Sequence, residues 1–211
     1  NGIKRVVNVG SSVDTSVRTV ELTEKYDFIY GAAGVHPEHA EELCAPGAYQ
    51  KLTECLKNSK VVALGEIGLD YHYEDNPDRK IQQKVFEMQL ELAAEMNKPV
   101  IIHSRDAAAD TFDIMKEMQA ENTGGIIHCF SYGKEMAGKY LDKGFYIGIG
   151  GVLTFKNARK LKEVAEYVPL DRIVIETDCP YMAPEPNRGK RNDSSNLKYV
   201  LGTLAQIKGL S

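Results

Sequence analysis

The stretch VVALGEIG (Val61–Gly68) is an apolar run rich in β-branched residues. Its hydrophobicity is continuous instead of alternating, which is typical of a parallel strand covered on both faces. The next segment, Lys80–Met96, places apolar residues at 81, 85, 88, 92 and 96, the spacing of one buried helical face. PVIIHSR (Pro99–Arg105) then returns to the strand pattern. The region therefore predicts a β–α–β unit.

The same alternation extends towards both ends of the chain. Further strand-like runs are Arg5–Gly10, Phe28–Gly34, Gly124–Phe130, Phe145–Gly151 and Arg172–Asp178. Further helical segments are Ala107–Met118, Lys134–Lys143, Asn157–Val168 and Asn196–Lys208. Asp106 is a suitable N-cap for the first of these helices. Gly144, Pro169 and Gly209 suit the positions at which the other three end.

Strands that alternate with helices predict a parallel α/β fold. A doubly wound dinucleotide fold is disfavoured, since no GxGxxG lies at a strand-to-helix turn. Gly148, Gly150 and Gly151 fall within a strand-like run, which indicates close packing or the approach of a ligand. We expect a TIM-type (β/α)8 barrel, with residues 1–211 forming a single domain. The chain begins in a strand-like run and ends after a helical segment, so we expect the barrel's first strand and C-terminal helix to be missing from it.

Composition indicates a soluble globular protein, with 43% hydrophobic and 27% charged residues. The net charge of −4 argues against coating nucleic acid by bulk electrostatics, although bound metal could supply positive potential locally. We identify no signal peptide and no apolar run near the roughly 18 residues that span a bilayer. Four widely spaced cysteines favour the reducing cytoplasm. A zinc-thiolate site at Cys129 and Cys179 is a disfavoured alternative, because their spacing is unlike that of known thiolate sites.

Polar residues recur where the predicted strands end. They are His36, Glu66, Asp70, His103, His128 and Asp178. Each alone has an ordinary structural explanation, such as a hydrogen-bonded rim histidine or a turn-forming aspartate. Together they would meet at the carboxyl ends of barrel strands, where barrel enzymes place their active sites. Burying carboxylates and imidazoles together is costly without a partner, so the pattern predicts a divalent cation. The mixed donor set suits zinc, manganese or iron and tolerates magnesium.

These strand ends resemble the TatD family of metal-dependent deoxyribonucleases, within the amidohydrolase-like barrel superfamily. The matching segments are GVHP (Gly34–Pro37), GEIGLDYHY (Gly65–Tyr73), PVIIHSRDA (Pro99–Ala107), IHCFS (Ile127–Ser131), GFYIGIGG followed by TFKNA (Gly144–Ala158), ETDCPYMAP (Glu176–Pro184) and RGKRN (Arg188–Asn192). The resemblance implies that Glu66, His103, His128 and Asp178 bind metal. It also implies catalytic roles for Asp178, which would take a proton from the attacking water, and for Glu66.

One part of the family pattern is not found. The family's first strand carries an HxH pair that completes a two-metal site, and no HxH occurs among the 211 residues. We therefore expect that this chain by itself does not hold the two ions (magnesium, manganese or zinc) of an intact site. Whether the intact protein has this strand, or the chain is a degraded relative, stays open.

The expected function is hydrolysis of phosphodiester bonds in DNA by metal-activated water, as a 3′–5′ exonuclease acting on single strands. Expected substrate-binding residues are His36, Arg188, Lys190 and Arg191; weaker candidates are Asp70, Arg105 and Lys156. Tyr71, Tyr73 and Tyr181 could stack on unpaired bases, although rim packing is favoured. Two alternatives stay open: a hydrolase of small-molecule or aminoacyl C–N or ester bonds, and a non-catalytic binding module. Nothing indicates a membrane or a protein partner.

Overall fold

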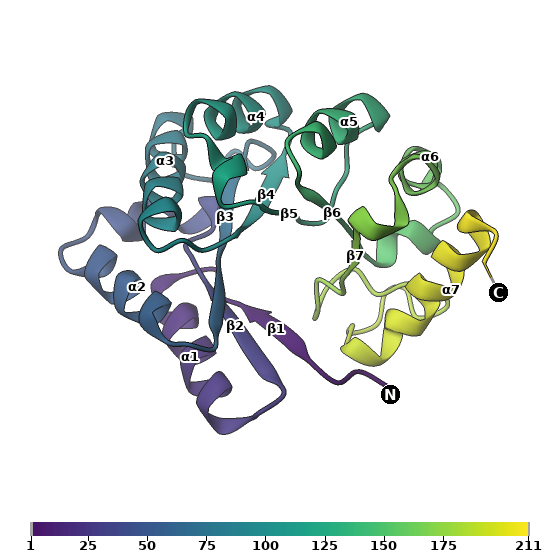
Figure 1. Ribbon diagram of the computed structural model, residues 1–211, viewed down its shortest axis with the longest axis horizontal. Helices are drawn as coiled ribbons and strands as arrows, with labels where there is room; N and C mark the ends of the chain where they lie inside the picture. The colour runs from purple at the N-terminus through teal and green to yellow at the C-terminus, as the bar shows by residue number, and fades with distance from the viewer. Residues whose placement is uncertain (1, 211) are drawn as a thin grey trace. The chain divides into compact units, whose positions relative to one another are not determined.

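The computed structural model describes residues 2–210, which form two compact units, 2–125 and 126–210 (Figure 1). The elements of the N-terminal unit are β1 (Val6–Val9), α1 (Val13–Lys25), β2 (Ile29–Ala33), a 3-10 helix (Pro37–Cys44), α2 (Ala48–Lys57), β3 (Val61–Asp70), α3 (Arg79–Glu95), β4 (Val100–Arg105), α4 (Ala108–Glu117) and a short 3-10 turn (Ala120–Asn122). Strand β5 (Gly125–Ile127) begins at the last residue of the N-terminal unit and continues into the C-terminal unit. The other elements of the C-terminal unit are α5 (Lys134–Asp142), β6 (Tyr146–Ile149), α6 (Arg159–Tyr167), β7 (Ile173–Ile175) and α7 (Leu197–Lys208), with 3-10 turns at Gly151–Thr154, Leu170–Arg172 and Ser194–Asn196.

Within each unit, every strand pairs in parallel with the next strand along the chain. In the N-terminal unit the order is β1-β2-β3-β4, and in the C-terminal unit it is β5-β6-β7. A helix lies between consecutive strands in the chain, as parallel pairing requires a crossover. The predicted parallel α/β fold of the TIM type is confirmed, and each predicted strand overlaps an observed one, with β3 extending two residues beyond the predicted Val61–Gly68. That the whole chain is a single domain stays a prediction.

The core of the N-terminal unit is built around β3, which is buried along almost its entire length. Leu64, Ile67 and Leu69 of this strand are all inaccessible to solvent. Phe86 of α3 and Leu52 of α2 are equally buried. Because burying one such side chain contributes about 1.5–3 kcal/mol, the strand is held firmly from both faces. This burial explains the continuous hydrophobicity of the β3 sequence.

The buried face of α3 differs from the prediction. Val85 and Leu92 are buried as expected, but Ile81, Met88 and Met96 are only partly buried. Two glutamines instead occupy the buried face, Gln82 and Gln89, with 2% and 1% exposure. Apolar spacing could not predict them, because a glutamine is buried only where its amide finds partners.

Those partners are main-chain groups beside the polar strand ends. The Gln89 amide accepts a hydrogen bond from the Val35 N–H at 2.8 Å and donates one to the Val35 carbonyl at 3.0 Å. The Gln82 amide contacts the Asp70 main chain in the same way, at 2.9 and 3.0 Å. Helix α3 therefore anchors the backbone next to His36 and at Asp70.

Two of the predicted helix ends are confirmed by left-handed glycines: Gly144 directly follows the C-cap of α5 with φ +81°, and Gly209 ends α7 with φ +65°. Helix α6 ends before Pro169, also as predicted. The prediction for Asp106 was wrong. Helix α4 begins at Ala108, Asp106 itself has φ +53°, and its carboxylate contacts the His72 ring at 2.7 Å instead of capping the helix.

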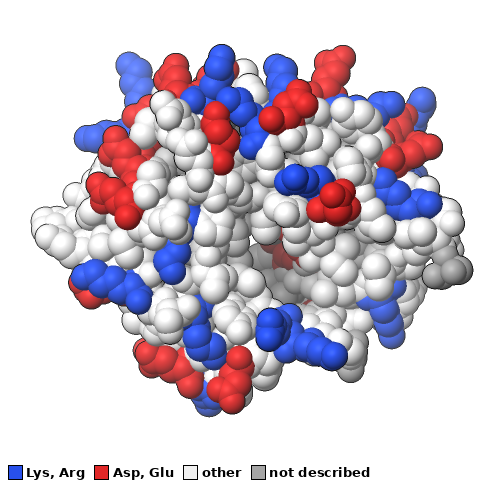
Figure 2. Space-filling model, viewed as in Figure 1, with Lys and Arg blue, Asp and Glu red and all other residues white. Residues whose placement is uncertain are grey.

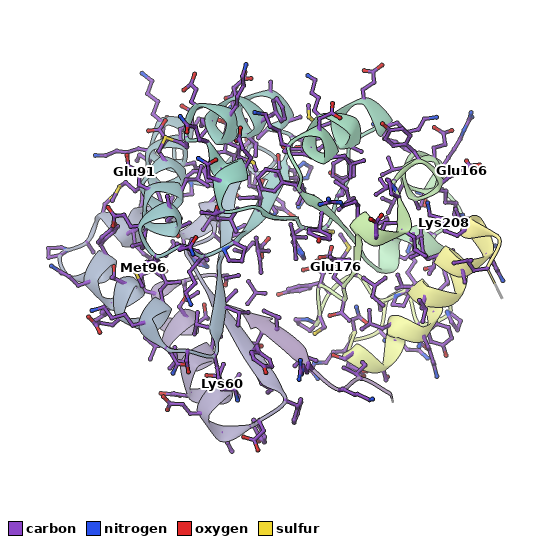
Figure 3. All side chains as sticks on the ribbon, in the orientation of Figure 1. Lys60, Glu91, Met96, Glu166, Glu176 and Lys208 are labelled. Atoms are coloured by element: carbon purple, nitrogen blue, oxygen red, sulfur yellow. The ribbon has the colours of Figure 1, made fainter. Side chains whose placement is uncertain are left out.

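Two lysines stabilise the carboxyl ends of helices in the same way (Figure 3). The Lys60 ammonium donates to the carbonyls of Thr23 and Tyr26 at the end of α1. The Lys208 ammonium donates to the carbonyls of Glu166 and Val168 at the end of α6, at 3.0 and 2.6 Å. A positive charge at this position complements the helix dipole and satisfies carbonyls that have no partner within the helix.

Helix α1, which was not among the predicted segments, begins with a capping box. The Ser12 hydroxyl accepts from the Thr15 N–H at 3.1 Å, and the Thr15 hydroxyl accepts from the Ser12 N–H at 2.8 Å. We expect Ser12→Ala to lower the free energy of unfolding by about 1 kcal/mol. Urea denaturation measures the change, with Ser59→Ala at an exposed turn as the control. An unchanged midpoint in Ser12→Ala would show that the cap contributes nothing.

No helix among residues 2–210 is long and apolar enough to cross a membrane.

Candidate metal-binding site

The N-terminal unit brings Glu66, Asp70 and His103 together at the carboxyl ends of β3 and β4. Glu66 and Asp70 are four residues apart in a strand, so their side chains leave the same face. His103 pairs in register with Gly68, which lies midway between them. As a result the His103 ring lies between two carboxylates, with Nδ1 2.9 Å from Glu66 Oε1 and Nε2 3.0 Å from Asp70 Oδ2.

The electrostatics of this group follow from its burial. Burial lowers the pKa of His103, but the hydrogen bonds and charges of Asp70 and Glu66 outweigh that effect and raise it above its ordinary value. For Asp70 the effect of burial has the opposite sign and raises the pKa, but hydrogen bonds from the His103 ring and the His72 N–H outweigh it, so the pKa of Asp70 is lowered. Asp70, with 3% exposure, is therefore held as a carboxylate that orients His103.

His36 lies against the same group from the end of β2. Its ring contacts that of His103 edge to face, with centroids 4.3 Å apart, and its Nε2 is 3.9 Å from Glu66 Oε1. Burial, and secondly the neighbouring His103, lower the pKa of His36 to about 4. His36 is therefore a neutral imidazole.

The proton of this neutral ring can be placed from its hydrogen bonds. His36 Nδ1 accepts a hydrogen bond from the Glu38 N–H at 3.2 Å. A neutral imidazole has one protonated and one unprotonated nitrogen, so Nε2 carries the hydrogen. His36, Glu66 and His103 lie close enough together to hold a metal ion, but this tautomer makes His36 Nε2 a hydrogen-bond donor, so of the three only Glu66 and His103 offer atoms that could bind an ion.

The C-terminal unit contains a second histidine–carboxylate group. His128 directly follows β5, and Glu176 and Asp178 follow β7 (Glu176 is labelled in Figure 3). His128 Nδ1 is 2.7 Å from Glu176 Oε2, and His128 Nε2 is 3.5 Å from Asp178 Oδ1. The other Glu176 oxygen accepts from the Cys129 N–H at 2.6 Å. In a neutral His128 ring, a proton on Nδ1 donated to Glu176 would leave Nε2 unprotonated and facing Asp178.

Glycine makes room for the Glu176 carboxylate. A Cβ atom on Gly148 would lie 2.7 Å from Glu176 Oε2, so any larger residue in β6 would displace the carboxylate. A Cβ atom on Gly151 would overlap the Met182 carbonyl. The GIGG segment therefore serves close packing, one of the two interpretations that its sequence allowed.

We expect Glu176→Gln to weaken metal binding by about 10- to 100-fold, the usual effect of removing a carboxylate that orients a histidine ligand. A glutamine oxygen can accept from His128 or from the Cys129 N–H, but an amide cannot replace both carboxylate contacts. Titration calorimetry with Zn²⁺ measures the change. Glu166→Gln, the same substitution at an exposed position of α6, is the matched control and should bind normally. Equal affinities in the two variants would contradict the positioning role.

The predicted basic residues lie in the loop between β7 and α7. Arg188, Lys190 and Arg191 are all exposed, and the Arg188 guanidinium lies 4.2 Å from the centroid of the Phe155 ring. Asn192, at the end of the same RGKRN motif, is 2% exposed and donates to the carbonyls of Thr177 and Tyr181. Asn192 therefore anchors the loop next to Asp178, a role that its position in a basic run did not suggest.

The structure brings together the predicted residues Glu66 and His103 in one unit, and His128 and Asp178 in the other. Asp70 was a weaker candidate for substrate binding. The contact between its carboxylate and His103 shows that it orients the His103 ring. Sequence reasoning missed Glu176, although the ETD motif places it two residues before Asp178. Its signal was a charged residue directly after an apolar strand, the same signal that identified the others.

The donor atoms fit a divalent cation. Zinc takes imidazole nitrogen and carboxylate oxygen at about 2.0–2.2 Å, so two ligands of one ion can lie up to about 4 Å apart. The Glu66–His103 and Asp178–His128 separations, 2.9 and 3.5 Å, satisfy this limit. Each histidine also has a second carboxylate on its other nitrogen, the arrangement that is usual around protein-bound metals.

A TIM-type parallel α/β chain with such histidine–carboxylate groups at its strand ends defines the class of metal-dependent barrel hydrolases. A family model described as TatD related DNase matches residues 1–211. The chain belongs to the TatD family of metal-dependent hydrolases.

Individual relatives agree with this assignment. YabD of Bacillus subtilis, named an uncharacterized metal-dependent hydrolase, is 46% identical over 99% of this chain and 81% of its own length. The protein named 3′-5′ ssDNA/RNA exonuclease TatD of Salmonella typhimurium is 30% identical over 99% of this chain and 81% of its own. The crystal structure of YJJV, a TatD homolog from Escherichia coli K12, superposes with a TM-score of 0.91 at 31% identity, covering 98% of this chain and 79% of that one.

Proposed function

We propose that this protein is a metal-dependent deoxyribonuclease that removes nucleotides from single-stranded DNA in the 3′–5′ direction. The observation that carries the proposal is the pair of histidine–carboxylate groups, Glu66–His103 and His128–Asp178, each oriented by a further carboxylate. The relative from Salmonella typhimurium, whose name states 3′-5′ ssDNA/RNA exonuclease activity, supports the substrate class.

In the proposal, Glu66, His103, His128 and Asp178 hold divalent metal, magnesium, manganese or zinc, with two ions in an intact site. When bound, such a metal supplies Lewis-acid chemistry, polarising a phosphoryl oxygen and lowering the pKa of water. Asp178, which is one-third exposed, accepts the proton of the attacking water as the general base. Glu66 is the other catalytic carboxylate.

Substrate contacts in the proposal come from His36, through its Nε2–H, and from Arg188, Lys190 and Arg191. Figure 2 shows that Lys and Arg side chains are interspersed with Asp and Glu on the face drawn. With a net charge of −4, the attraction of a phosphate depends on such local groups. The proposed compartment is the cytoplasm, where the exposed thiols of Cys44 and Cys179 stay reduced.

The test is hydrolysis of single-stranded DNA labelled at its 5′ or 3′ end, by the full-length protein with magnesium, manganese or zinc, and with EDTA. The proposal expects cleavage that depends on metal, is abolished by EDTA and gives a ladder of products shortened from the 3′ end. Duplex DNA and small aryl esters and amides serve as comparison substrates.

Two results would contradict the proposal. No cleavage of DNA with any metal, from folded protein shown to bind metal, would exclude the nuclease, and cleavage of the ester or amide would then indicate a small-molecule hydrolase. A ladder shortened from the 5′ end would exclude the stated direction.

A further inference from the structure

Tyr73 is an exposed aromatic residue that is nevertheless held in a fixed position. It lies in the loop after β3, three residues beyond Asp70, and is 52% exposed. The Arg105 guanidinium lies over its ring, 4.8 Å from the centroid, and Arg105 Nη1 donates to its hydroxyl at 3.1 Å. The His72 ring contacts it edge to face, with centroids 4.8 Å apart.

The neighbouring residues explain why this loop is rigid. Tyr71 donates from its hydroxyl to Asp110 at 2.8 Å, and the Arg79 guanidinium lies 4.3 Å from its ring centroid. Burial, and secondly the hydrogen bond to Asp110, raise the pKa of Tyr71 to about 12, so it remains a donor. Tyr71 is therefore packed in place and only partly exposed, which fixes the chain two residues before Tyr73.

The location of Tyr73 ties it to the proposed active site. Asp70 pairs in register with Arg105, and the Tyr71 N–H donates to the Arg105 carbonyl at 2.9 Å. Arg105 itself is two residues after His103, and Tyr73 three after Asp70. The Tyr73–Arg105 pair therefore continues outward from the strand ends that carry Asp70 and His103.

The chemistry of the pair identifies its ligand. Arg105 lies over the Tyr73 ring and the His72 ring contacts it edge to face, yet more than half of the residue is exposed, so part of the ring surface is available to a flat ligand. A guanidinium has five donor hydrogens in a planar fork and binds phosphate well. A nucleotide combines a flat ring with a phosphate, and a base in a single strand can stack on a protein ring, whereas a base inside a duplex is already stacked on both faces.

We propose that Tyr73 and Arg105 form a nucleotide subsite, in which an unpaired base stacks on Tyr73 and a backbone phosphate contacts Arg105. The inference rests on the proposed nuclease function and deepens it, because it gives a physical reason for preferring single strands. A base inside a duplex is stacked on both faces and is not offered to Tyr73 without unpairing.

The test compares Tyr73→Ala, Tyr73→Phe and the wild type in the full-length protein with manganese. On a single-stranded oligonucleotide, Tyr73→Ala should raise KM about tenfold, within the range measured for lost base stacking. Tyr73→Phe retains the ring and should stay within about threefold of the wild type. On an oligonucleotide whose positions are all abasic, a chain of phosphodiesters without any ring to stack, all three should be equal. Tyr167→Ala, at a tyrosine with 51% exposure in the other unit, is the matched control and should change nothing.

Two further measurements separate stacking from general damage. For the wild type, KM should be higher on an oligonucleotide with one abasic position than on the normal one, by about the factor that Tyr73→Ala causes. For Tyr73→Ala, the abasic position should cause no further increase in KM. Arg105→Gln should reduce the slope of log KM against log salt by about one, the value for one lost phosphate contact. The abasic measurement on the wild type tests base stacking without any substitution, so it remains valid even if Tyr73→Ala folds poorly.

Several outcomes would overturn the subsite. They are an unchanged KM in Tyr73→Ala, equal losses on the normal and the fully abasic oligonucleotide, and additive effects of the single abasic position and Tyr73→Ala. If the wild type cleaves single-stranded DNA and Tyr73→Ala and Arg105→Gln have the KM and salt dependence of the wild type, the subsite is excluded and the proposed function is retained. If the wild type cleaves no DNA, the proposed function fails and the subsite with it.

Discussion

Asp178→Asn is expected to lower the rate of DNA hydrolysis by about 10²- to 10⁴-fold, the usual contribution of a general base. Asparagine has nearly the same shape as aspartate, but its amide cannot accept a proton from water. The carboxylate lies 3.5 Å from His128 Nε2 and is 33% exposed, so it can reach both the His128 ring and solvent. The measurement is kcat on single-stranded DNA at saturating manganese, which compensates for weakened metal affinity.

The control for this variant is Asp171→Asn, the same substitution in the exposed turn before β7, which should retain full activity. Circular dichroism and thermal denaturation establish that both variants are folded. A folded Asp178→Asn protein that keeps more than about one-tenth of the wild-type kcat would rule out the general-base role. Recovery of full activity at high manganese would instead assign Asp178 to metal binding alone.

Gly68→Ala is expected to destabilise the protein by about 3 kcal/mol or more. A Cβ atom on Gly68 would overlap the main chain of His103 in β4, and the φ of +140° is one that side chains rarely adopt. Both overpacking and backbone strain of this kind typically cost about 1–3 kcal/mol each. The midpoint of urea denaturation measures the loss. Because His103 must move away, binding of Zn²⁺ should weaken as well.

Gly202→Ala provides the control for this prediction. Gly202 lies in the interior of α7 with no atom near its added Cβ, so the substitution should raise stability by up to about 1 kcal/mol. A Gly68→Ala protein with the wild-type midpoint would show that β3 and β4 can separate locally without cost, and that Gly68 is not required for their close approach.

Much of the site could be predicted from single residues. Glu66, His103, His128 and Asp178 interrupt apolar runs with groups that are costly to bury, and that contrast is visible in the chain itself. Glu176 carries the same signal, but the metal-binding role was assigned to Asp178, two residues later, and not to Glu176. Which nitrogen of each histidine faces which carboxylate depends on neighbours that are 33 to 50 positions away, so no local pattern could indicate it.

The buried glutamines of α3 show the same limit. Periodicity predicted a face through Ile81, Met88 and Met96, whereas the helix turns Gln82 and Gln89 inward. A glutamine reads as polar in sequence, and it is buried here because its amide pairs with the main chain of Asp70 and Val35. Only the packed structure provides those partners.

The sequence by itself determined the parallel α/β class, the position of each strand and the residue types available at the strand ends. These features depend on hydrophobic period and on local chemistry, which are properties of short segments. The tertiary structure alone decided which side chains meet, because contacts between β3 and β4 or between His128 and Glu176 join segments that are distant in the chain. It therefore also decided which nitrogen of His36 is protonated, the hydrogen bonds from α3 to the Val35 main chain, and the contact of Arg105 with Tyr73.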